Sequence, residues 1–262
     1  MGTATLPAPF RLDGRTAFVS AARGHLGCAM TRALAEAGAH VIVNGRDNEA
    51  LARFECQLRA ENFAVSRAAF DVCDLKQVRA FFEGIGRLDI LVNNAVAMQV
   101  KGFDALDAAD FATTYHSAVT ASFEAVRACL PALKAAARAH GEASVINVAS
   151  IYGQVAPDGR LYAGREQQSP FHYGPAKAAV LQLTRHLAAE LGPSKIRVNA
   201  LVPGAFPAKA KPELADSLAS RTMLGRVGDA REIGAPLLFL ASPASSYMTG
   251  SALNIDGGWT AW

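Results

Sequence analysis

Short apolar runs alternate along the chain with longer stretches in which apolar residues recur every three or four positions. The short runs are rich in Val, Ile, Leu and Phe, as buried strands are, and the longer stretches have the periodicity of amphipathic helices. The predicted strands are 16–20, 40–44, 64–72, 88–95, 143–149, 196–204 and 251–256. The predicted helices are 28–38, 49–60, 76–86, 108–139, 173–191 and 231–240, of which the fourth is interrupted near Pro131.

This alternation predicts a single α/β fold, a doubly wound parallel sheet with helices on both faces. The pattern follows a short N-terminal tail, residues 1–9, and extends over residues 10–262 without a linker or an internal repeat. Residues 205–230 contain two prolines and two glycines and are predicted to be irregular. Because ligands of such sheets bind outside the carboxyl ends of the strands, functional residues are expected there.

Composition restricts the class of protein. The chain has 262 residues, of which 51% are hydrophobic and 19% charged, as in ordinary globular proteins. The formal net charge is +3 and the basic residues are dispersed, so nucleic acid is not an expected partner. Cys28, Cys56, Cys73 and Cys129 lie far apart and lack metal-ligand spacing, so no metal site or disulfide framework is expected. Without a long apolar run, we expect a cytoplasmic protein with no membrane partner.

The first predicted strand leads into a loop that is a candidate phosphate site. The loop reads Ser20-Ala21-Ala22-Arg23-Gly24-His25-Leu26-Gly27. Backbone N–H groups at the start of the following helix can bind a pyrophosphate, and Gly27 allows the helix to pack closely. The alternative is an ordinary tight turn between a strand and a helix, which two glycines would also suit.

Polar residues also follow the third and fourth predicted strands. Asp71, beside Val72, is placed to accept a hydrogen bond from an adenine ring. Asn93, Asn94 and Ala95 end the fourth strand, where a dinucleotide would lie. The alternative is that these residues only form turns, as Asp and Asn often do.

Tyr173 and Lys177 are the strongest chemical signal, because residues four positions apart share one face of a helix. Pro175 fits a helix only in its first turn, which puts Tyr173 at the helix N-terminus. There the helix dipole and the Lys177 charge would lower the pKa of Tyr173, so that it exchanges a proton with a substrate oxygen. Ser150 ends strand 143–149 and is placed to hydrogen-bond the same oxygen. Taken singly, each of the three is more often structural.

Together these residues resemble the short-chain dehydrogenase/reductase family, from about Phe10 to Trp262. The shared motifs are Asn93-Asn94-Ala95, Ser150 with Gly153, Tyr173-x-x-x-Lys177, Pro203-Gly204 and Asp256-Gly257-Gly258. The resemblance implies a single Rossmann-type domain of about seven strands that transfers a hydride between NAD(P) and an alcohol or carbonyl compound. It also implies a small-molecule substrate and a homodimer or homotetramer.

The resemblance assigns roles to individual residues. Tyr173 would be the catalytic acid/base, Lys177 would bind the nicotinamide ribose, and Ser150 would hold the substrate oxygen. Pro203 and Gly204 would line the nicotinamide.

The chain departs from the family pattern at several positions. Ala21 and His25 change the usual glycine loop, although Gly24 stands just before His25. Val96 replaces the glycine that usually follows the Asn-Asn-Ala motif, and Ala208 stands where a threonine is common.

A further departure concerns the proton relay. In the segment 111–123, Ala118 stands where the family has an asparagine that supports a relay water. Ser117 and His116 are candidate substitutes. We expect catalysis that is present but slow.

The end of the second predicted strand bears on the choice between NADP and NAD. It reads Asn44-Gly45-Arg46, with glycine where an acidic residue would accept from a ribose 2′-hydroxyl. Arg46 can pair with a 2′-phosphate, and Arg23 in the glycine loop can add a second positive charge. NADP is therefore the predicted cofactor. NAD is the alternative, because a longer strand would place the Asp47 carboxylate at the ribose.

Two long connections are predicted to wall the substrate pocket. Residues 156–170 are inserted between Ser150 and Tyr173, and long loops in compact domains are often functional. Their polar side chains are Asp158, Arg160, Tyr162 and Arg165, and the surrounding stretch resembles a subgroup of the family that acts on sugars or sugar acids. Residues 205–230 are the predicted substrate lid, with Lys209, Lys211, Arg221 and Arg226 available to anionic groups. The alternative for the insertion is an oligomer contact.

The sequence thus predicts an NAD(P)-dependent oxidoreductase that acts on a secondary alcohol or ketone, polar or sugar-like. One alternative is a catalytically impaired cofactor-binding protein, a sensor or assembly partner, which the departures above would suit. A sugar-nucleotide epimerase or dehydratase is disfavoured, because almost no chain remains for a substrate domain.

Overall fold

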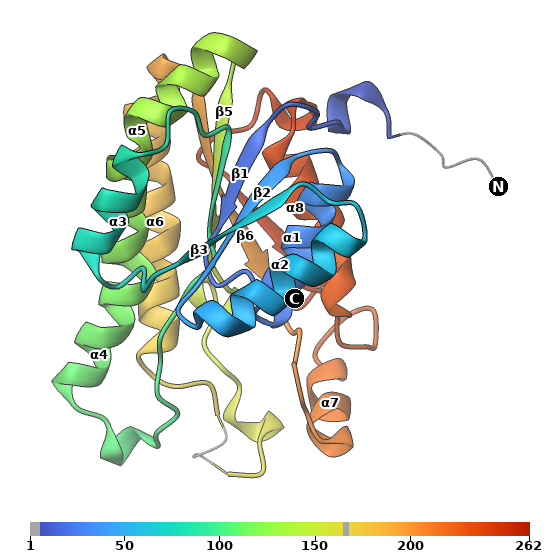
Figure 1. Ribbon diagram of the computed structural model, residues 1–262. Helices are drawn as coiled ribbons and strands as arrows, with labels where there is room; N and C mark the ends of the chain where they lie inside the picture. The colour runs from blue at the N-terminus through green and yellow to red at the C-terminus, as the bar shows by residue number, and fades with distance from the viewer. Residues whose placement is uncertain (1–5, 165–167) are drawn as a thin grey trace.

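The computed structural model describes residues 6–164 and 168–262. Seven parallel strands form one sheet in the order β3-β2-β1-β4-β5-β6-β7 (Figure 1). The strands are β1 (Thr16–Val19), β2 (His40–Gly45), β3 (Val65–Ala69), β4 (Ile90–Asn93), β5 (Ala143–Val148), β6 (Ile196–Pro203) and β7 (Ala252–Ile255). The predicted fold class, a single doubly wound parallel sheet, is confirmed.

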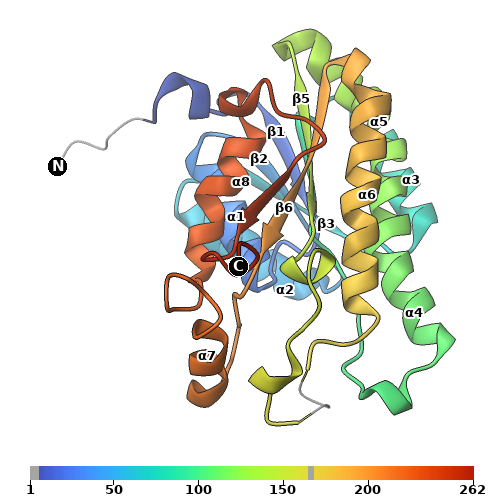
Figure 2. The same cartoon turned by 180° about the vertical axis from the view of Figure 1, so that it is seen from behind.

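Helices cover both faces of this sheet (Figures 1 and 2). They are α1 (His25–Glu36), α2 (Asn48–Ala60), α3 (Leu75–Glu83), α4 (Ala108–Tyr115), α5 (Ala121–His140), α6 (Tyr173–Leu191), α7 (Pro212–Ala219) and α8 (Gly234–Ala241). Helices α1, α2 and α8 pack on one face, and α3, α5 and α6 pack on the other.

The core has one apolar layer on each face of the sheet and a further apolar cluster around Ile151 and Trp259, next to the candidate site. Met30 and Leu34 of α1 belong to the first layer, and Val78 of α3 and Leu133 of α5 belong to the second. Every residue of β5 and β6 is buried, which is why these strands read as continuous apolar runs rather than as alternating ones. Each fully buried aliphatic side chain stabilises the fold by about 1.5–3 kcal/mol.

The long helix predicted over 108–139 is interrupted, but not at Pro131. Pro131 lies inside α5, on its exposed side, where water can satisfy the carbonyl left without an N–H partner. The interruption is a π-helical turn, His116–Thr120, in which the Ala121 N–H donates to the His116 carbonyl. Turns of this kind are frequent at functional sites.

Two further predictions need correction. Residues 205–230 are not wholly irregular, because Pro212 starts helix α7 as its first residue, a position that suits a residue without an N–H. Helix α1 begins at His25 rather than at residue 28, so the second part of the glycine loop is already helical.

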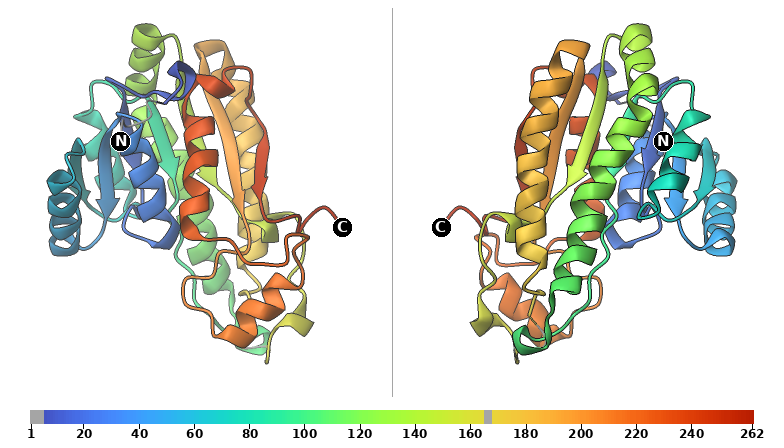
Figure 3. Two further views of the ribbon diagram at one scale, coloured as in Figure 1. Left: turned by 90° about the vertical axis from the view of Figure 1, so that its right-hand side faces the viewer. Right: turned by 90° about the vertical axis from the view of Figure 1, so that its left-hand side faces the viewer.

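The connections that follow the strands gather at one end of the molecule. Figure 3 shows α7, the segment between β5 and α6, and the connection into α4 together below the sheet. This is the carboxyl edge, where a doubly wound sheet binds its ligands. Among the described helices, none combines the length and apolar character that crossing a bilayer requires.

Candidate active site

Ser150 stands just beyond the end of β5, at the turn toward the carboxyl edge of the sheet. It is the N-cap of a short 3₁₀ turn, Ile151–Gly153, and its Oγ accepts a hydrogen bond from the Tyr152 N–H at 3.2 Å. Only 6% of Ser150 is exposed. The cap fixes the position of the hydroxyl just beyond the end of β5.

Glycines allow the turn after Ser150 to approach its neighbours closely. A Cβ on Gly153 would lie 2.7 Å from the Lys177 carbonyl carbon, and a Cβ on Gly174 would lie 2.8 Å from the Tyr152 carbonyl oxygen. A Cβ on Gly204, after β6, would overlap the Ile151 side chain. The absence of these Cβ atoms brings the Ser150 turn against the first turns of α6 and the end of β6.

Tyr173 is the first residue of α6, and Lys177 lies one turn later on the same face. The Lys177 Nζ is 5.6 Å from the centre of the Tyr173 ring and donates to the Val148 carbonyl at 2.6 Å. Burial raises the pKa of the Tyr173 phenol, and the nearby Ser150 hydroxyl partly offsets that rise. The three predicted catalytic residues therefore converge at one point.

Burial governs the acid–base character of this group. It lowers the pKa of Lys177 to about 8, because the interior disfavours the charged ammonium. Burial also raises the pKa of Tyr173, an effect larger than the lowering by Ser150. The prediction that the helix start lowers the tyrosine pKa is therefore wrong for the protein alone, because removal of the phenolate from water is the larger effect.

The loop between β1 and α1 has the form of a phosphate cradle. Its N-cap residue, Gly24, has no side chain to cap the helix, so the first N–H groups of α1, from His25 and Leu26 onward, face the carboxyl edge. A Cβ on Gly27 would overlap the backbone of Ala21 and Ala22. This loop fits a dinucleotide pyrophosphate despite the altered glycine pattern.

Four polar residues predicted to touch the cofactor have side chains that bond within the protein. Ser20 Oγ accepts from the N–H groups of Asn94 and Ala95 at 2.8 and 3.0 Å, and Asn94 donates to the Ser20 carbonyl at 3.1 Å. Asn93 donates to Asn147 Oδ1 at 2.9 Å. Asn44 donates to the carbonyls of Ala68 and Phe70. These hydrogen bonds hold the ends of β1, β2 and β4 together at the carboxyl edge of the sheet.

Charged residues follow β2 and β3, at the strand ends where the sequence predicts contacts to the adenosine half of the cofactor. Arg46 is largely exposed, with 78% of its side chain accessible, and its Nη1 is 4.0 Å from Asp71 Oδ2. Asp71 Oδ1 accepts from the Cys73 N–H at 2.9 Å, and Val72 packs against the core beside it.

Asp47, the residue on which the NAD alternative depends, is the N-cap of α2. Its carboxylate accepts from the Ala50 N–H at 2.9 Å. That bond lowers the pKa of Asp47, and the charges of Arg23 and Arg53 add to the effect. The Asp47 carboxylate is therefore engaged as a helix cap, while Arg46 remains exposed beside it in the sequence.

The π-helical turn holds the position where the family has its relay asparagine. Ala118 is 2% exposed, and its carbonyl accepts from Ser122 Oγ at 2.8 Å. Ser117 Oγ bonds to the Ala97 and Thr114 backbone, and His116 Nε2 is 2.9 Å from the Cys73 carbonyl. Both candidate substitutes are therefore held by other partners.

The described part of the inserted segment contacts the turn that follows Ser150. Tyr162 Oη is 2.6 Å from Tyr152 Oη, and Asp158 forms a two-point ion pair with Arg160. Arg165, also predicted to wall the pocket, lies outside the described residues.

The predicted lid carries fewer free cations than its sequence suggests. Arg226 is paired with Glu232 at 2.7 Å, and Arg221 stacks on Trp259 at 6.0 Å. Lys209 and Lys211 are exposed.

Within the described residues, no group of three or more His, Cys, Asp or Glu side chains could hold a metal ion.

Two residues that the sequence did not single out border the catalytic group. The Tyr152 ring packs edge-on against Trp259, 6.4 Å between centres, and Trp259 is 3% exposed. Tyr152 could have been found from its position two residues after Ser150. Trp259 follows the Asp-Gly-Gly motif, but nothing in the sequence indicates that it reaches the turn after β5.

Known proteins resemble the whole chain. A family model described as enoyl-(acyl carrier protein) reductase matches residues 21–260. Galactitol 2-dehydrogenase (L-tagatose-forming) of Cereibacter sphaeroides is 35% identical over 97% of this chain and 98% of its own. Gluconate 5-dehydrogenase of Gluconobacter oxydans is 32% identical over 97% of this chain and 98% of its own.

A solved structure has the same fold. The gluconate 5-dehydrogenase from Burkholderia cenocepacia, in complex with NADP and tartrate, superimposes with a TM-score of 0.86. It is 31% identical, and the match covers 97% of this chain and 98% of that one. With its sheet order, its glycine cradle and its Ser150, Tyr173 and Lys177 group, the chain belongs to the short-chain dehydrogenase/reductase family of oxidoreductases.

Proposed function

We propose that this protein transfers a hydride between NADP and a secondary alcohol or ketone of a polar, polyhydroxylated substrate, with Tyr173 as the acid/base. The observation that carries this proposal is the convergence of Ser150, Tyr173 and Lys177 at the carboxyl edge of the sheet. A hydroxyl, a phenol and an ammonium are the groups needed to hold a reacting oxygen and move its proton.

The nicotinamide, when bound, supplies a hydride acceptor or donor at the carbon that carries the substrate oxygen. In oxidation this carbon loses a hydride and its oxygen loses a proton, which Tyr173 accepts as phenolate. Ser150 holds the oxygen by a hydrogen bond as its charge changes. Lys177 is charged below its pKa of about 8. Its charge favours the Tyr173 phenolate and so opposes the rise that burial causes in the pKa of Tyr173. In reduction the same steps run in reverse.

The backbone N–H groups at Gly24–Gly27 would hold the pyrophosphate, and Pro203 and Gly204 would border the nicotinamide. Arg46 and Arg23 would pair with the 2′-phosphate, which favours NADP over NAD as the cofactor. The exposure of Arg46 supports this assignment, as does the use of Asp47 as a helix cap. The NADP bound to the related gluconate dehydrogenase also supports it.

The relatives support a hydroxylated substrate. Two of them are named for galactitol and for gluconate, and each of these compounds has several hydroxyl groups. In this proposal, residues 156–170 and the lid, residues 205–230, wall the substrate pocket.

A homodimer or homotetramer is part of the same proposal. Phe111 and Tyr115 of α4 and Phe123 of α5 expose aromatic surface along one side of the molecule. Monomeric proteins rarely leave such a row of aromatic rings in water.

The test is a calorimetric titration with NADPH and NADH in parallel, followed by NADP-linked turnover on polyols and ketones. Binding of NADPH at micromolar concentration, weaker binding of NADH and measurable turnover are expected. NADPH binding without turnover on any substrate would contradict the proposal and favour a non-catalytic cofactor-binding protein.

A further inference from the structure

Trp259 contacts both the turn that follows Ser150 and the lid, residues 205–230. Its ring packs edge-on against that of Tyr152, 6.4 Å between centres, and the Arg221 guanidinium of the lid lies 6.0 Å from the ring centre. Only 3% of Trp259 is exposed. The proposed mechanism gives no role to this buried indole, although it touches both segments that the mechanism needs.

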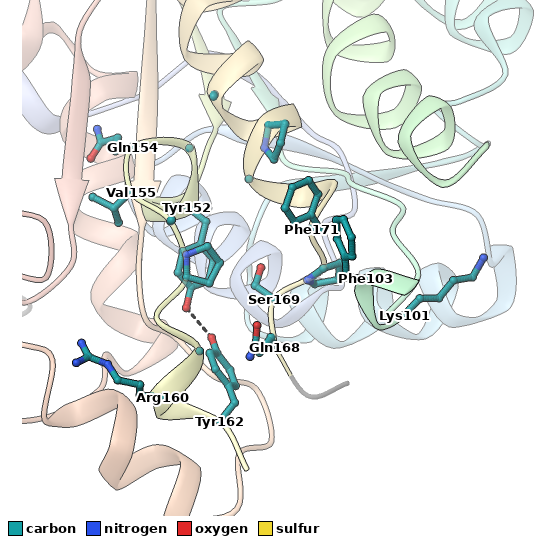
Figure 4. Close-up of a pocket in the computed structure, with 18 of the residues that line it drawn as sticks. Lys101, Phe103, Tyr152, Gln154, Val155, Arg160, Tyr162, Gln168, Ser169 and Phe171 are labelled. Atoms are coloured by element: carbon teal, nitrogen blue, oxygen red, sulfur yellow. Dashed lines mark hydrogen bonds between the residues drawn. The ribbon is translucent and has the colours of Figure 1, made fainter. Parts of the chain in front are cut away.

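The contact with Tyr152 bears on the position of Ser150. Ile151, the first residue of the turn, lies in the same buried apolar cluster as Trp259. The Tyr152 N–H donates to Ser150 Oγ, and the Tyr152 hydroxyl is 2.6 Å from that of Tyr162, the contact dashed in Figure 4. Tyr152 is thus held at its hydroxyl by the inserted segment and at its ring by Trp259. A side chain fixed at two points limits the movement of the N–H that orients Ser150.

A second contact joins the same turn to the C-terminal segment. Gln154 follows the turn, and its side-chain amide exchanges two hydrogen bonds with that of Asn254 in β7, at 3.0 and 2.7 Å (Figure 4). Asn254 also donates to Thr260 Oγ1 at 2.7 Å. The Asp256 carboxylate accepts from the N–H of Thr260 at 3.0 Å and from its hydroxyl at 2.6 Å. These bonds fix the backbone around Trp259 relative to the turn.

The C-terminal segment also holds the lid. The Trp262 Nε1–H donates to the Arg221 carbonyl at 3.2 Å, and the Leu224 N–H donates to the Gly257 carbonyl at 3.1 Å. The Arg221 side chain lies over the Trp259 ring. Because ring–ring and cation–ring contacts depend on orientation, the indole fixes the angle as well as the separation of its two neighbours.

We propose that Trp259 is a positioning residue, which acts through Tyr152 on the Ser150 hydroxyl and through Arg221 on the lid. The inference rests on the proposed function, because it connects the catalytic group and the lid of that proposal.

The first test is Trp259→Leu, assayed at saturating NADP or NADPH with the best substrate of the polyol and ketone screen described above. Leucine fills part of the space but makes neither the edge-on contact nor the cation–ring contact. We expect kcat to fall at least about tenfold, as displacement of a catalytic group causes, and KM to rise severalfold as the lid loosens. Trp259→Phe retains a ring against Tyr152 and should restore most of kcat.

The pH profile of kcat gives a readout that a loss of stability alone does not move. The Ser150 hydroxyl partly offsets the rise that burial causes in the pKa of Tyr173. Displacement of Ser150 in Trp259→Leu should therefore raise the pKa of Tyr173. The limb of the profile that Tyr173 sets should move to higher pH, whether the rate rises through it in oxidation or falls through it in reduction. Lys177 and Tyr152, which also lie near Tyr173, are unchanged in this variant.

The matched control is Leu191→Ala. Leu191 is 5% exposed and is the last residue of the 19-residue helix α6, about 27 Å along the helix from Tyr173. Its truncation should lower the free energy of unfolding and leave kcat and the pH profile equal to those of the unmodified protein. Urea denaturation establishes that each variant is folded under the assay conditions.

Trp259→Met keeps the inference testable if Trp259→Leu does not fold, because the flexible thioether fills an irregular space but lacks a flat ring. It should show the same fall in kcat and the same shift of the pH limb.

Equal kcat and pH profiles for the Trp259 variant and Leu191→Ala would overturn the inference alone. So would a Trp259→Phe protein as impaired as Trp259→Leu. A fall in kcat without a rise in KM would overturn the part that concerns the lid. Absence of turnover by the unmodified protein on every substrate would overturn the proposed function and this inference with it.

Discussion

The Lys177 ammonium lies 5.6 Å from the centre of the Tyr173 ring, within one turn of the same helix. It is anchored from the other side by the Val148 carbonyl at the end of β5. The geometry of the pair therefore depends on how closely α6 packs against the strand that carries Ser150. Gly153 permits that close packing, because no Cβ separates it from the Lys177 backbone.

Gly153→Ala should impair catalysis more than folding. The added Cβ would lie 2.7 Å from the Lys177 carbonyl carbon, so the Ser150 turn and α6 must separate by a fraction of an ångström or more. We expect kcat to fall about 10–100-fold, as misplacements of this size do, with a loss of about 1–3 kcal/mol in unfolding free energy. Steady-state kinetics and urea denaturation measure the two effects.

The matched control is Gly102→Ala. A Cβ on Gly102 would meet no heavy atom of the described chain within 4 Å, and its φ of −64° suits any residue. Equal kcat for the two variants would show that the close approach at Gly153 has no catalytic role.

Burial of Lys177 has a consequence for stability. Its pKa falls from 10.5 to about 8 on folding, so the folded state binds fewer protons between these two pH values. Below pH 8 the buried lysine is charged, and the cost of burying this charge lowers the free energy of unfolding in full. As pH rises from 8 toward 10.5, the lysine of the folded protein loses its proton and this cost is relieved. Stability of the unmodified protein should therefore rise over this interval, relative to a variant without the lysine.

Lys177→Met tests that effect, because methionine fills similar space without a charge. The difference in unfolding free energy between Lys177→Met and the unmodified protein should shift by about 3 kcal/mol from pH 7 to pH 10.5. The variant should be favoured at the lower pH. Urea denaturation at a series of pH values provides the measurement. A difference that stays constant with pH would mean that Lys177 keeps its ordinary pKa.

Arg46→Ala should change cofactor preference rather than cofactor binding in general. Loss of a charge-assisted contact to the 2′-phosphate should weaken NADPH binding about 10–100-fold and leave NADH binding within about twofold. Arg185→Ala is the control, because Arg185 is an exposed arginine of α6, on the other face of the sheet, and its Nη1 donates to Gln182 Oε1 at 2.9 Å. Calorimetric titration with each cofactor measures the two dissociation constants. An unchanged ratio of the Kd for NADPH to the Kd for NADH would contradict the assignment of Arg46 to the 2′-phosphate.

Ala118→Asn should increase turnover, since it restores the family's relay residue within the π-helical turn. Ala118 is 2% exposed, so the larger side chain should also lower the unfolding free energy by about 1–3 kcal/mol. Kinetics at saturating NADP and thermal unfolding report these changes. Unchanged or lower kcat in a folded variant would indicate a proton path that does not use this position.

Helix and strand periodicity predicted the sheet and most of its helices correctly, because strands such as β5 and β6 are buried on both faces. The errors concern local features: a break expected at one residue, a π-helical turn that was not predicted, and the start of α1. Pro131 is tolerated in α5, whereas the π-helical turn at His116–Thr120 has no breaker residue to reveal it. Pro212 starts a helix in a segment whose other prolines and glycines favour irregular structure.

Motif spacing predicted that Tyr173 and Lys177 lie together at the start of α6, since a helical repeat fixes the relation of the two residues. Its electrostatics could not be predicted, because the burial that shifts both pKa values arises from distant segments. The Tyr152–Tyr162 contact was equally hidden, since it depends on the path of the inserted segment. Asn44 and Asn93 show the same limit. The sequence predicts that they lie at strand ends, but it does not indicate the hydrogen-bond partners of their side chains.

The most direct test of the account is Tyr173→Phe, assayed for NADP-linked turnover and for NADPH binding by calorimetry. Removal of the one hydroxyl that exchanges the proton should reduce kcat by about 10²–10⁴-fold and leave the Kd for NADPH within about twofold. Turnover that survives this substitution would contradict the assignment of Tyr173 as the acid/base.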